Sequence, residues 1–189
     1  MKYKTWIRLA GLACLIGLLS LAPASRSLAA AAWTKPGGVY IRSDGTAIAG
    51  VVARGVDVSH WNQSINWNAV AADDIQFAMI GTRYNNAADP NFAVNAQGAA
   101  AAGLRVGAYL YSYATTVEAA KAEAAFVLNL IKDYPISYPV VFDVEAPELN
   151  SLSPSALADI INAFCQEVRS AGYYPMVYAN DYWLAEKID

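Results

Sequence analysis

Residues 139–146 read PVVFDVEA, and this stretch decides how the rest of the sequence is interpreted. An apolar run with β-branched residues is typical of a strand buried inside a sheet. Four other stretches share this character, and longer segments with helical signals separate them. These stretches are GVDVS from Gly55, FAMIGTRY from Phe77, VGAYLYSY from Val106 and PMVYAN from Pro175. The sequence therefore predicts five buried strands that alternate with helices.

The segments between these strands contain helix boundaries. Two of them pair an N-cap residue with proline and end at glycine: Asp89-Pro90 to Gly103, and Ser153-Pro154 to Gly172. Thr115 and Glu118 have the spacing of a capping box. The last helix has one apolar stripe, which is formed by Leu157, Ile160, Ile161, Phe164 and Val168.

Strand and helix alternating at this rhythm indicate parallel pairing with right-handed crossovers. The fold class is thus α/β, either a doubly wound open sheet or part of a β/α barrel of the TIM type. Periodicity alone supports the open sheet and the barrel almost equally. No glycine-rich phosphate loop follows the strand from Gly55, which argues against a nucleotide-binding sheet, and we prefer the barrel.

The first 54 residues differ from this pattern. Residues 1–29 combine Lys2, Lys4 and Arg8 with an apolar run and a small-residue end, as a secretory signal peptide does. The run is shorter than the roughly 20 residues of a membrane span. Residues 30–54 hold turn signals between short apolar runs, so we expect a lead-in segment or hairpin before a domain over residues 55–189.

Charge and composition exclude several functions. Without residues 1–29, nine basic side chains face 16 acidic ones, a net charge of −7, so nucleic acid is not an expected partner. Cys165 would then be the only cysteine, without an internal disulfide partner, and an apolar helical setting suits a buried thiol better than a nucleophile. His60 is the single histidine, so we expect no metal site, and no cofactor is required.

Asp143 and Glu145 are the main candidates for chemistry. Alternation along a strand turns both to one face, with α-carbons roughly 6.6 Å apart. Two like charges this close in an apolar setting do not both ionise freely, so one carboxyl should keep its proton near neutral pH. Glycoside hydrolysis needs such a pair. An isolated Asp-x-Glu more often caps a segment or pairs with cations, but burying two acids at a strand end is costly without a purpose.

Other candidates lie near the same strand ends. Asp57 is an acid within an apolar strand and would face the same barrel mouth, with a structural hydrogen bond as the equal alternative. The aromatic candidates for sugar binding are Tyr111, Tyr178, Trp61 and Tyr84, although such residues belong to protein cores more often than to binding sites.

Six stretches of the sequence, taken together, resemble the glycoside hydrolase family 25 muramidases. These stretches are GVDVSHWN, FAMIGTRY, Asp89-Pro90-Asn91-Phe92, AAGLRVGAYLYSYA, YPVVFDVE and GYYPMVYAN. The resemblance runs from Gly55 to about Trp183. It implies a β/α barrel and cleavage of peptidoglycan between N-acetylmuramic acid and N-acetylglucosamine. By position, Glu145 resembles the family's acid, Asp143 its stabilising or nucleophilic partner, and Asp57 the acid of the first strand. Tyr111 and Tyr178 resemble substrate-lining tyrosines.

The sequence departs from this family after PMVYAN. Five strands cannot close an eight-stranded barrel, so we expect an incomplete one with about five of the eight strands. The sequence is then either part of a longer reading frame or an inactive relative, and we favour the former. We expect a secreted, cell-wall-associated bacterial lysozyme that acts on peptidoglycan strands and has no membrane contact once the signal peptide is cleaved. Its oligomeric state is left open. The alternative is a non-catalytic protein that binds the cell wall.

Overall fold

The computed structural model describes residues 33–188. The chain divides into two compact units between Ala49 and Gly50, and each unit is described by itself. The expected signal peptide over residues 1–29 lies outside the described residues.

The first unit contains a short hairpin. Strand β1 (Trp33–Thr34) pairs antiparallel with β2 (Ile41–Arg42), and the short 3-10 helix η1 (Pro36–Gly38) lies between them. A tight turn follows β2, in which the Asp44 side chain accepts a hydrogen bond from the Thr46 backbone N–H at 2.8 Å. The turn signals of this segment thus correspond to local backbone hydrogen bonding.

The second unit is built on a parallel sheet of five strands. In spatial order these are β3 (Gly55–Val58), β4 (Phe77–Gly81), β7 (Arg105–Tyr111), β8 (Ile136–Asp143) and β9 (Pro175–Tyr178). All four pairings are parallel, which confirms the predicted α/β class. The order follows the chain without reversal, unlike that of a doubly wound sheet. Among the described residues β3 and β9 are the sheet edges, so closure into a barrel stays a prediction.

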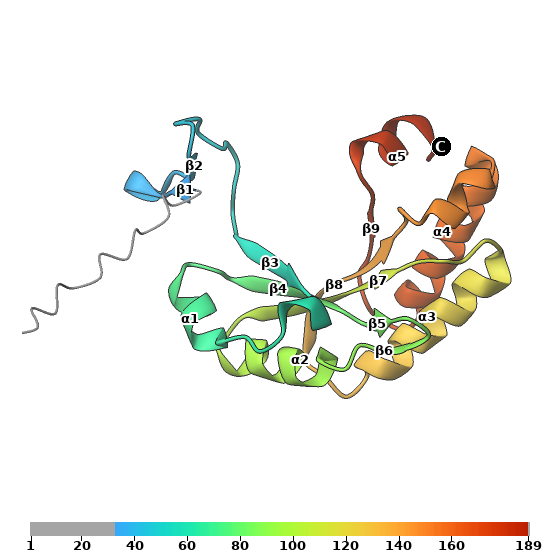
Figure 1. Ribbon diagram of the computed structural model, residues 1–189, viewed down its shortest axis with the longest axis horizontal. Coiled ribbons are helices and arrows are strands. Elements are labelled where there is room, and N and C mark those ends of the chain that lie inside the picture. Colours follow the sequence, from blue (N-terminus) through green and yellow to red (C-terminus); the bar gives the residue numbers. More distant parts are fainter. Residues whose placement is uncertain (1–32, 189) are drawn as a thin grey trace, which may run out of the picture. The chain divides into compact units, whose positions relative to one another are not determined.

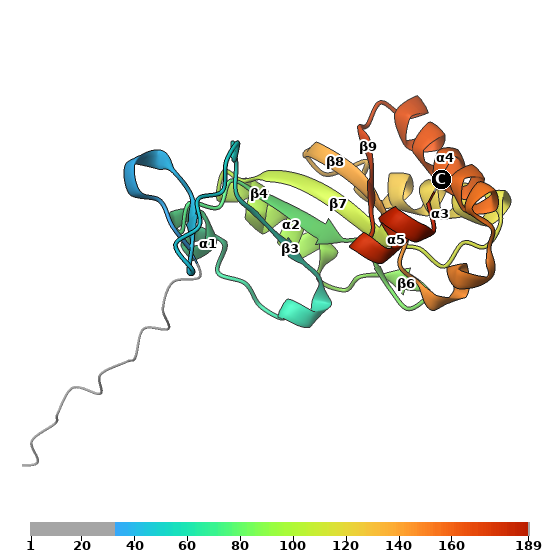
Figure 2. The same cartoon turned by 90° about the horizontal axis from the view of Figure 1, so that it is seen from above.

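Helices cover one side of this sheet. The helices are α1 (Trp67–Ala72), α2 (Phe92–Ala101), α3 (Val117–Ile131), α4 (Pro154–Ser170) and α5 (Asp181–Glu186). Shorter elements are η2 (His60–Asn62), β5 (Arg83–Tyr84), β6 (Ala87–Ala88) and η3 (Pro147–Ser151). Figures 1 and 2 show α1 to α4 arranged along the outer side of the twisted sheet.

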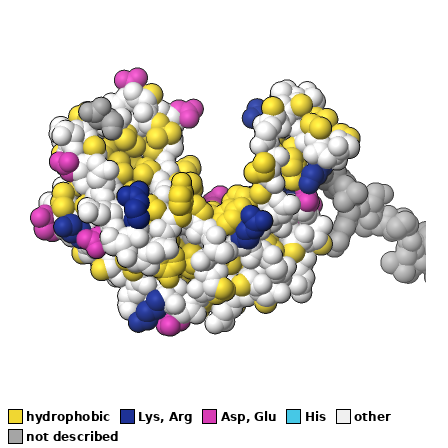
Figure 3. All heavy atoms as spheres, turned by 180° about the vertical axis from the view of Figure 1, so that it is seen from behind, with side chains coloured by type: hydrophobic (Ala, Val, Ile, Leu, Met, Phe, Trp, Pro, Cys, Tyr) yellow, Lys and Arg dark blue, Asp and Glu magenta, His cyan; other side chains and the backbone are white. Residues whose placement is uncertain are grey.

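Burial differs between the two faces of the sheet. The side chains turned toward the helices are fully buried: Ala78, Ile80, Val106, Ala108, Leu110, Val140 and Phe142. On the other face Tyr109 and Tyr111 are half-buried, while Met176 and Tyr178 are 41% and 51% exposed. Figure 3 shows hydrophobic side chains gathered over the surface of α4, α5 and β9. The open face is therefore the one on which a ligand can reach the sheet.

Two helix starts differ from the prediction. The α2 N-cap is Asn91 rather than Asp89, because the Asp89 carboxylate bonds the Asn91 N–H in a turn before the helix. The α3 N-cap is Thr116 rather than Thr115. Helix α4 begins as predicted, with the Ser153 side chain capping its first turn. Its predicted apolar stripe is buried throughout.

Strand β8 starts three residues before the predicted Pro139, and its pairing with β7 shifts register there. Proline has no N–H to donate, so within a central strand it is tolerated at an irregularity of this kind. Gly107 faces the irregularity, and a Cβ on it would lie 2.8 Å from the Pro139 carbonyl oxygen and 2.5 Å from the Met79 side chain. The glycine therefore allows the close approach of the strands.

The stacking of Phe164 on Phe142 provides a test of this core. Their ring centroids are 4.1 Å apart and both side chains are fully buried, so Phe164→Ala removes the contact between α4 and β8. We expect the free energy of unfolding in urea to fall by about 3–5 kcal/mol. Val94→Ala on the exposed side of α2 is the control and should change it by less than about 0.5 kcal/mol. If both substitutions lowered the free energy of unfolding equally, the stacking of Phe164 on Phe142 would not stabilise the core.

Candidate active site

Three polar side chains form a row at the carboxyl ends of adjacent strands. Tyr111 in β7 lies opposite Asp143 in β8, and Asp143 lies opposite Tyr178 in β9. The backbone holds this row in register, because Ser112 N–H donates to the Asp143 carbonyl at 2.9 Å and Val144 N–H donates to the Tyr178 carbonyl at 3.0 Å. The register thus brings together three of the residues that the sequence singled out.

Asp143 and Glu145 lie beside each other at the end of β8. Val144 between them is fully buried, as alternation along an extended chain requires. Asp143 is 8% exposed, and Glu145 is half-buried. The oxygens Asp143 Oδ1 and Glu145 Oε1 are both buried and have no hydrogen-bond partner among the described residues. Carboxyl oxygens in this state can bind a substrate group.

The Asp143 carboxyl keeps its proton to a higher pH than an exposed aspartate does. Burial raises the pKa of Asp143, and the negative charges of Glu145 and Asp57 raise it further, to about 7. One proton is therefore retained at this site near neutral pH. The family resemblance had implied Glu145 as the acid and Asp143 as its partner. In the structure the raised pKa belongs to Asp143, because its position within the strand buries it more deeply.

Asp57 belongs to the same electrostatic group although it lies on a distant strand. Its strand β3 is separated from β8 by β4 and β7, and its side chain is exposed. Its negative charge nevertheless raises the pKa of Asp143. Three carboxyl groups thus share the open face of the sheet at the carboxyl ends of the strands, where α/β proteins collect reactive groups.

The tyrosines on this face respond to the same charges. Burial and then Asp143 raise the pKa of Tyr111, whereas Glu145 is the main cause of the raised pKa of Tyr178. Tyr109 also has a raised pKa, caused chiefly by burial. These rings therefore keep their hydroxyl protons and can donate hydrogen bonds near the carboxyls.

Trp61 and Tyr84 lie in a second group, outside this row. Trp61 is in η2 after β3, Tyr84 is in β5, and their rings meet edge to face with centroids 6.2 Å apart. Both are exposed, by 77% and 40%. His60 contacts both rings, and it was not among the site residues predicted from the sequence.

A buried ionic network, which was not predicted from the sequence, supports the segment that carries Tyr111. Glu123 of α3 accepts hydrogen bonds from Arg83 at 2.8 Å, Ser112 Oγ at 2.7 Å and Tyr113 N–H at 3.1 Å. Arg83 also donates to the Tyr111 carbonyl. A signal was present, because Glu123 is an acid within the apolar stripe of α3.

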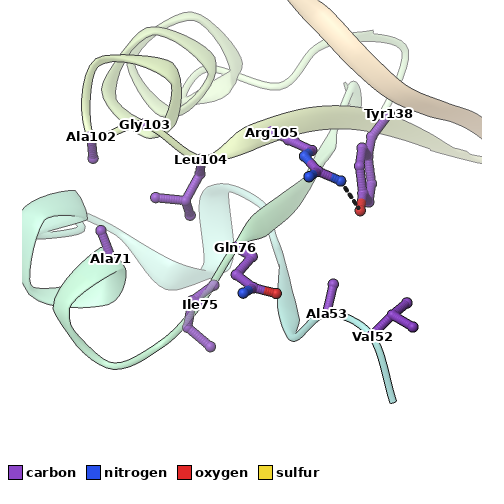
Figure 4. A pocket seen from close by; sticks show the side chains of 10 residues that line it. All are labelled: Val52, Ala53, Ala71, Ile75, Gln76, Ala102, Gly103, Leu104, Arg105 and Tyr138. Carbon is purple, nitrogen blue, oxygen red and sulfur yellow. Dashed lines mark hydrogen bonds between the residues drawn. The ribbon is translucent and has the colours of Figure 1, made fainter. Parts of the chain in front are cut away.

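A surface hollow lies at the opposite end of the sheet. It is lined by residues that include Gln76 and Arg105 at the starts of their strands, and Arg105 donates a hydrogen bond to the Tyr138 hydroxyl at 3.1 Å (Figure 4). Arg105 is the only charged side chain among its lining residues. The hollow is remote from the carboxyl ends, so it takes no part in the carboxyl site.

Within residues 33–188, no group of three or more histidine, cysteine, aspartate or glutamate side chains is placed to hold a metal ion. In the same part of the chain, no helix has the length and apolar character needed to cross a bilayer.

Sequence comparison gives one family. Residues 56–189 match Glycosyl hydrolases family 25. The YegX protein of Escherichia coli O157:H7 is 34% identical over 132 residues, which cover 66% of this chain and 47% of YegX. Lysozyme M1 of Streptomyces globisporus is 42% identical over 60 residues, which cover 31% of this chain and 20% of that protein. The chain thus spans about half the length of YegX.

Solved structures share the fold. The autolysin LytC of Streptococcus pneumoniae, solved with a synthetic peptidoglycan ligand, has a TM-score of 0.69 at 23% identity, over 80% of this chain and 39% of LytC. A muramidase from Trichobolus zukalii has a TM-score of 0.59 at 27% identity, over 70% of this chain and 67% of that one. A family 25 lysozyme from Aspergillus fumigatus has a TM-score of 0.58 at 28% identity, over 70% of this chain and 68% of that one. By its sequence match and its fold, this chain belongs to glycosyl hydrolase family 25.

Proposed function

We propose that this protein is a secreted lysozyme that hydrolyses the β-1,4 bond between N-acetylmuramic acid and N-acetylglucosamine in peptidoglycan. The observation that carries the proposal is the pair Asp143 and Glu145, each with a buried oxygen that has no partner among the described residues. Glycosidases need two carboxyls in different protonation states, and the pKa of Asp143, about 7, supplies that difference.

Each carboxyl has a proposed role. Glu145 protonates the glycosidic oxygen, ionised Asp143 stabilises the positive charge that develops on the sugar, and water completes the hydrolysis. In the substrate-free protein the retained proton is on Asp143, so it must pass to Glu145 when the substrate binds. Asp143 is then ionised when positive charge develops on the sugar, and it stabilises that charge. Asp57 adds negative charge to the same face. No metal or organic cofactor takes part.

The aromatic side chains supply the binding surface. Tyr111 and Tyr178 flank Asp143 in the row across β7, β8 and β9, where their hydroxyls can bond sugar oxygens. Trp61 and Tyr84 offer exposed rings, which suit the apolar faces of sugars.

The proposed site of action is the bacterial cell wall. The relatives support this location, since one is described as an autolysin with a peptidoglycan ligand and another as a muramidase. We propose that residues 1–29 are removed as a signal peptide, leaving the protein associated with the wall and free of the membrane.

The first test replaces the proposed acid. Glu145→Gln keeps the size of the side chain but cannot donate a carboxyl proton, so release of reducing sugar from purified peptidoglycan should fall on the order of 100-fold to 10,000-fold. Glu186→Gln, at an exposed position in α5, is the matched control and should be as active as the parent. Full activity in Glu145→Gln would contradict the mechanism. Binding of peptidoglycan by the parent without release of reducing sugar would instead support a non-catalytic wall-binding protein.

The pH dependence of the rate tests the shared proton. Below about pH 7 the pair holds one proton, and above it Asp143 loses that proton, which leaves no donor for the glycosidic oxygen. We therefore expect kcat/KM to decrease as pH rises through about 7, approaching about tenfold per pH unit. Rates measured from pH 5 to pH 9 on one substrate preparation check this. A rate that stays level or increases across that range would show that the reactive form holds no proton on the pair.

Stability should show the same titration. The pKa of Asp143 is about 7 in the folded state against about 3.9 in an unfolded chain, so the folded state binds more protons and loses stability as pH rises from about 4 to 7. Asp143→Asn carries no charge and escapes this loss. At pH 8 we expect it to be more stable than the parent by about 2 kcal/mol, after allowance for solvent screening, with little difference at pH 4.5. Urea unfolding at both pH values measures this, and a pH-independent difference would refute it.

A further inference from the structure

His60 is held by a buried carboxylate at the end of β3. The Asp89 side chain is fully buried, and its Oδ2 lies 2.8 Å from both the backbone nitrogen and the ring Nδ1 of His60. Its Oδ1 accepts a third hydrogen bond, from the Asn91 N–H at 2.8 Å. Both the backbone and the ring of His60 are therefore fixed by one acid from another loop.

This arrangement determines what the other ring nitrogen can do. A carboxylate only accepts hydrogen bonds, so Nδ1 of His60 must carry a hydrogen toward Asp89. In the neutral imidazole Nε2 is then an acceptor. Nε2 is buried and has no hydrogen-bond partner among the described residues. A buried polar atom without a partner is unfavourable, and a ligand hydroxyl or amide N–H would satisfy it.

Two exposed aromatic rings surround His60. Its ring centroid lies 3.9 Å from that of Tyr84 and 4.5 Å from that of Trp61. Trp61 and Tyr84 are nearly perpendicular, with 84° between their planes. A sugar presents an apolar face to stack on a ring and hydroxyls at its edge, so a corner of two rings beside a fixed acceptor suits it. Trp61 is 77% exposed, so its ring is available for a ligand to stack on.

The cluster of His60, Trp61 and Tyr84 is connected to the carboxyl site through Tyr109. The Tyr109 hydroxyl lies near Ser59, the residue directly before His60, because a Cβ on Gly81 would be 3.0 Å from that hydroxyl and 3.1 Å from the Ser59 Cβ. Tyr109 also experiences the negative charges of Asp57, Asp143 and Asp89. One ring thus lies within electrostatic reach of both groups, so a glycan chain with its reactive bond at Asp143 could extend toward the cluster.

We propose that His60, Trp61 and Tyr84 form a saccharide subsite that holds an N-acetylhexosamine unit away from the bond being cut, with Asp89 as its positioning residue. The sugar stacks on the Trp61 ring and donates a hydrogen bond to His60 Nε2. Asp89 sets the direction of that acceptor. This inference rests on the proposed lysozyme function, to which it adds the roles of His60 and Asp89.

The test uses the full chain and a defined probe, the β-1,4-linked tetramer of N-acetylglucosamine. In a Glu145→Gln background, tryptophan fluorescence should change on titration with the tetramer, and Trp61→Phe should remove most of that change. His60→Phe keeps an aromatic ring but lacks the acceptor nitrogen, so the dissociation constant should rise about fivefold to tenfold. Tyr174→Ala removes a ring that is 74% exposed at the other end of the sheet and is the control.

Kinetics on peptidoglycan separate a subsite from a general structural effect. With Glu145 intact, His60→Phe and Trp61→Ala should raise KM about fivefold to tenfold and leave kcat within about twofold, because they weaken binding away from the reacting bond. Asp89→Asn should do the same if it acts through His60, but Asp89 also joins two loops. Thermal unfolding of each variant is therefore measured beside the kinetics to detect a loss of stability. The subsite is judged from the variants of the exposed residue Trp61 and of His60.

The outcomes separate this inference from the proposed function. Hydrolysis that proceeds with unchanged KM in both His60→Phe and Trp61→Ala would overturn the subsite and leave the lysozyme function standing. Tetramer binding with a Trp61 signal, but no hydrolysis in the parent, would support the subsite and refute the proposed catalysis. A fluorescence change that persists in Trp61→Phe would overturn the subsite directly.

Discussion

The site depends on the alternation of side chains along β8 and on what covers each face. Val140, Phe142 and Val144 are fully buried on the helical side, so Asp143 and Glu145 must turn to the opposite face. Moving the strand by one residue would bury both acids under the helices and expose the valines, at a large energetic cost. The packing that stabilises the sheet therefore also holds two carboxyl groups together at its rim.

That rim is only partly accessible to water, which raises the pKa of Asp143. Asp143 lies within the strand and is largely removed from solvent, so burial is the leading cause of its raised pKa, and the charges of Glu145 and Asp57 add to it. Asp57 stands three strands away in the sheet order, yet it contributes to this shift. The open face thus acts as one electrostatic unit, in which the protonation of one acid depends on the others.

Polar contacts outside the carboxyl group keep the surrounding side chains in place. Glu123 reaches from α3 to Arg83 and to the segment after β7, so a helix on the covered side helps to set the position of Tyr111 on the open side. Asp89 does the equivalent for His60. Both acids accept three hydrogen bonds, which offsets the cost of burying a charge. Glu123 and Asp89, whose carboxylates are fully hydrogen-bonded, therefore hold other residues in place. Asp143, which has a buried oxygen without a partner among the described residues, is instead placed for chemistry.

The sequence by itself determined the strand and helix order, the apolar stripe of α4 and the pairing of Asp143 with Glu145 on one face, because these follow from local periodicity and capping. It did not show which carboxyl keeps the proton, since that depends on burial and on Asp57 from another strand. It also assigned Asp89 to a helix cap, whereas in the folded chain that acid holds His60, 29 positions away. Local patterns decide elements and faces, while charge state and long-range partners are decided only when the tertiary structure removes water and brings distant residues together.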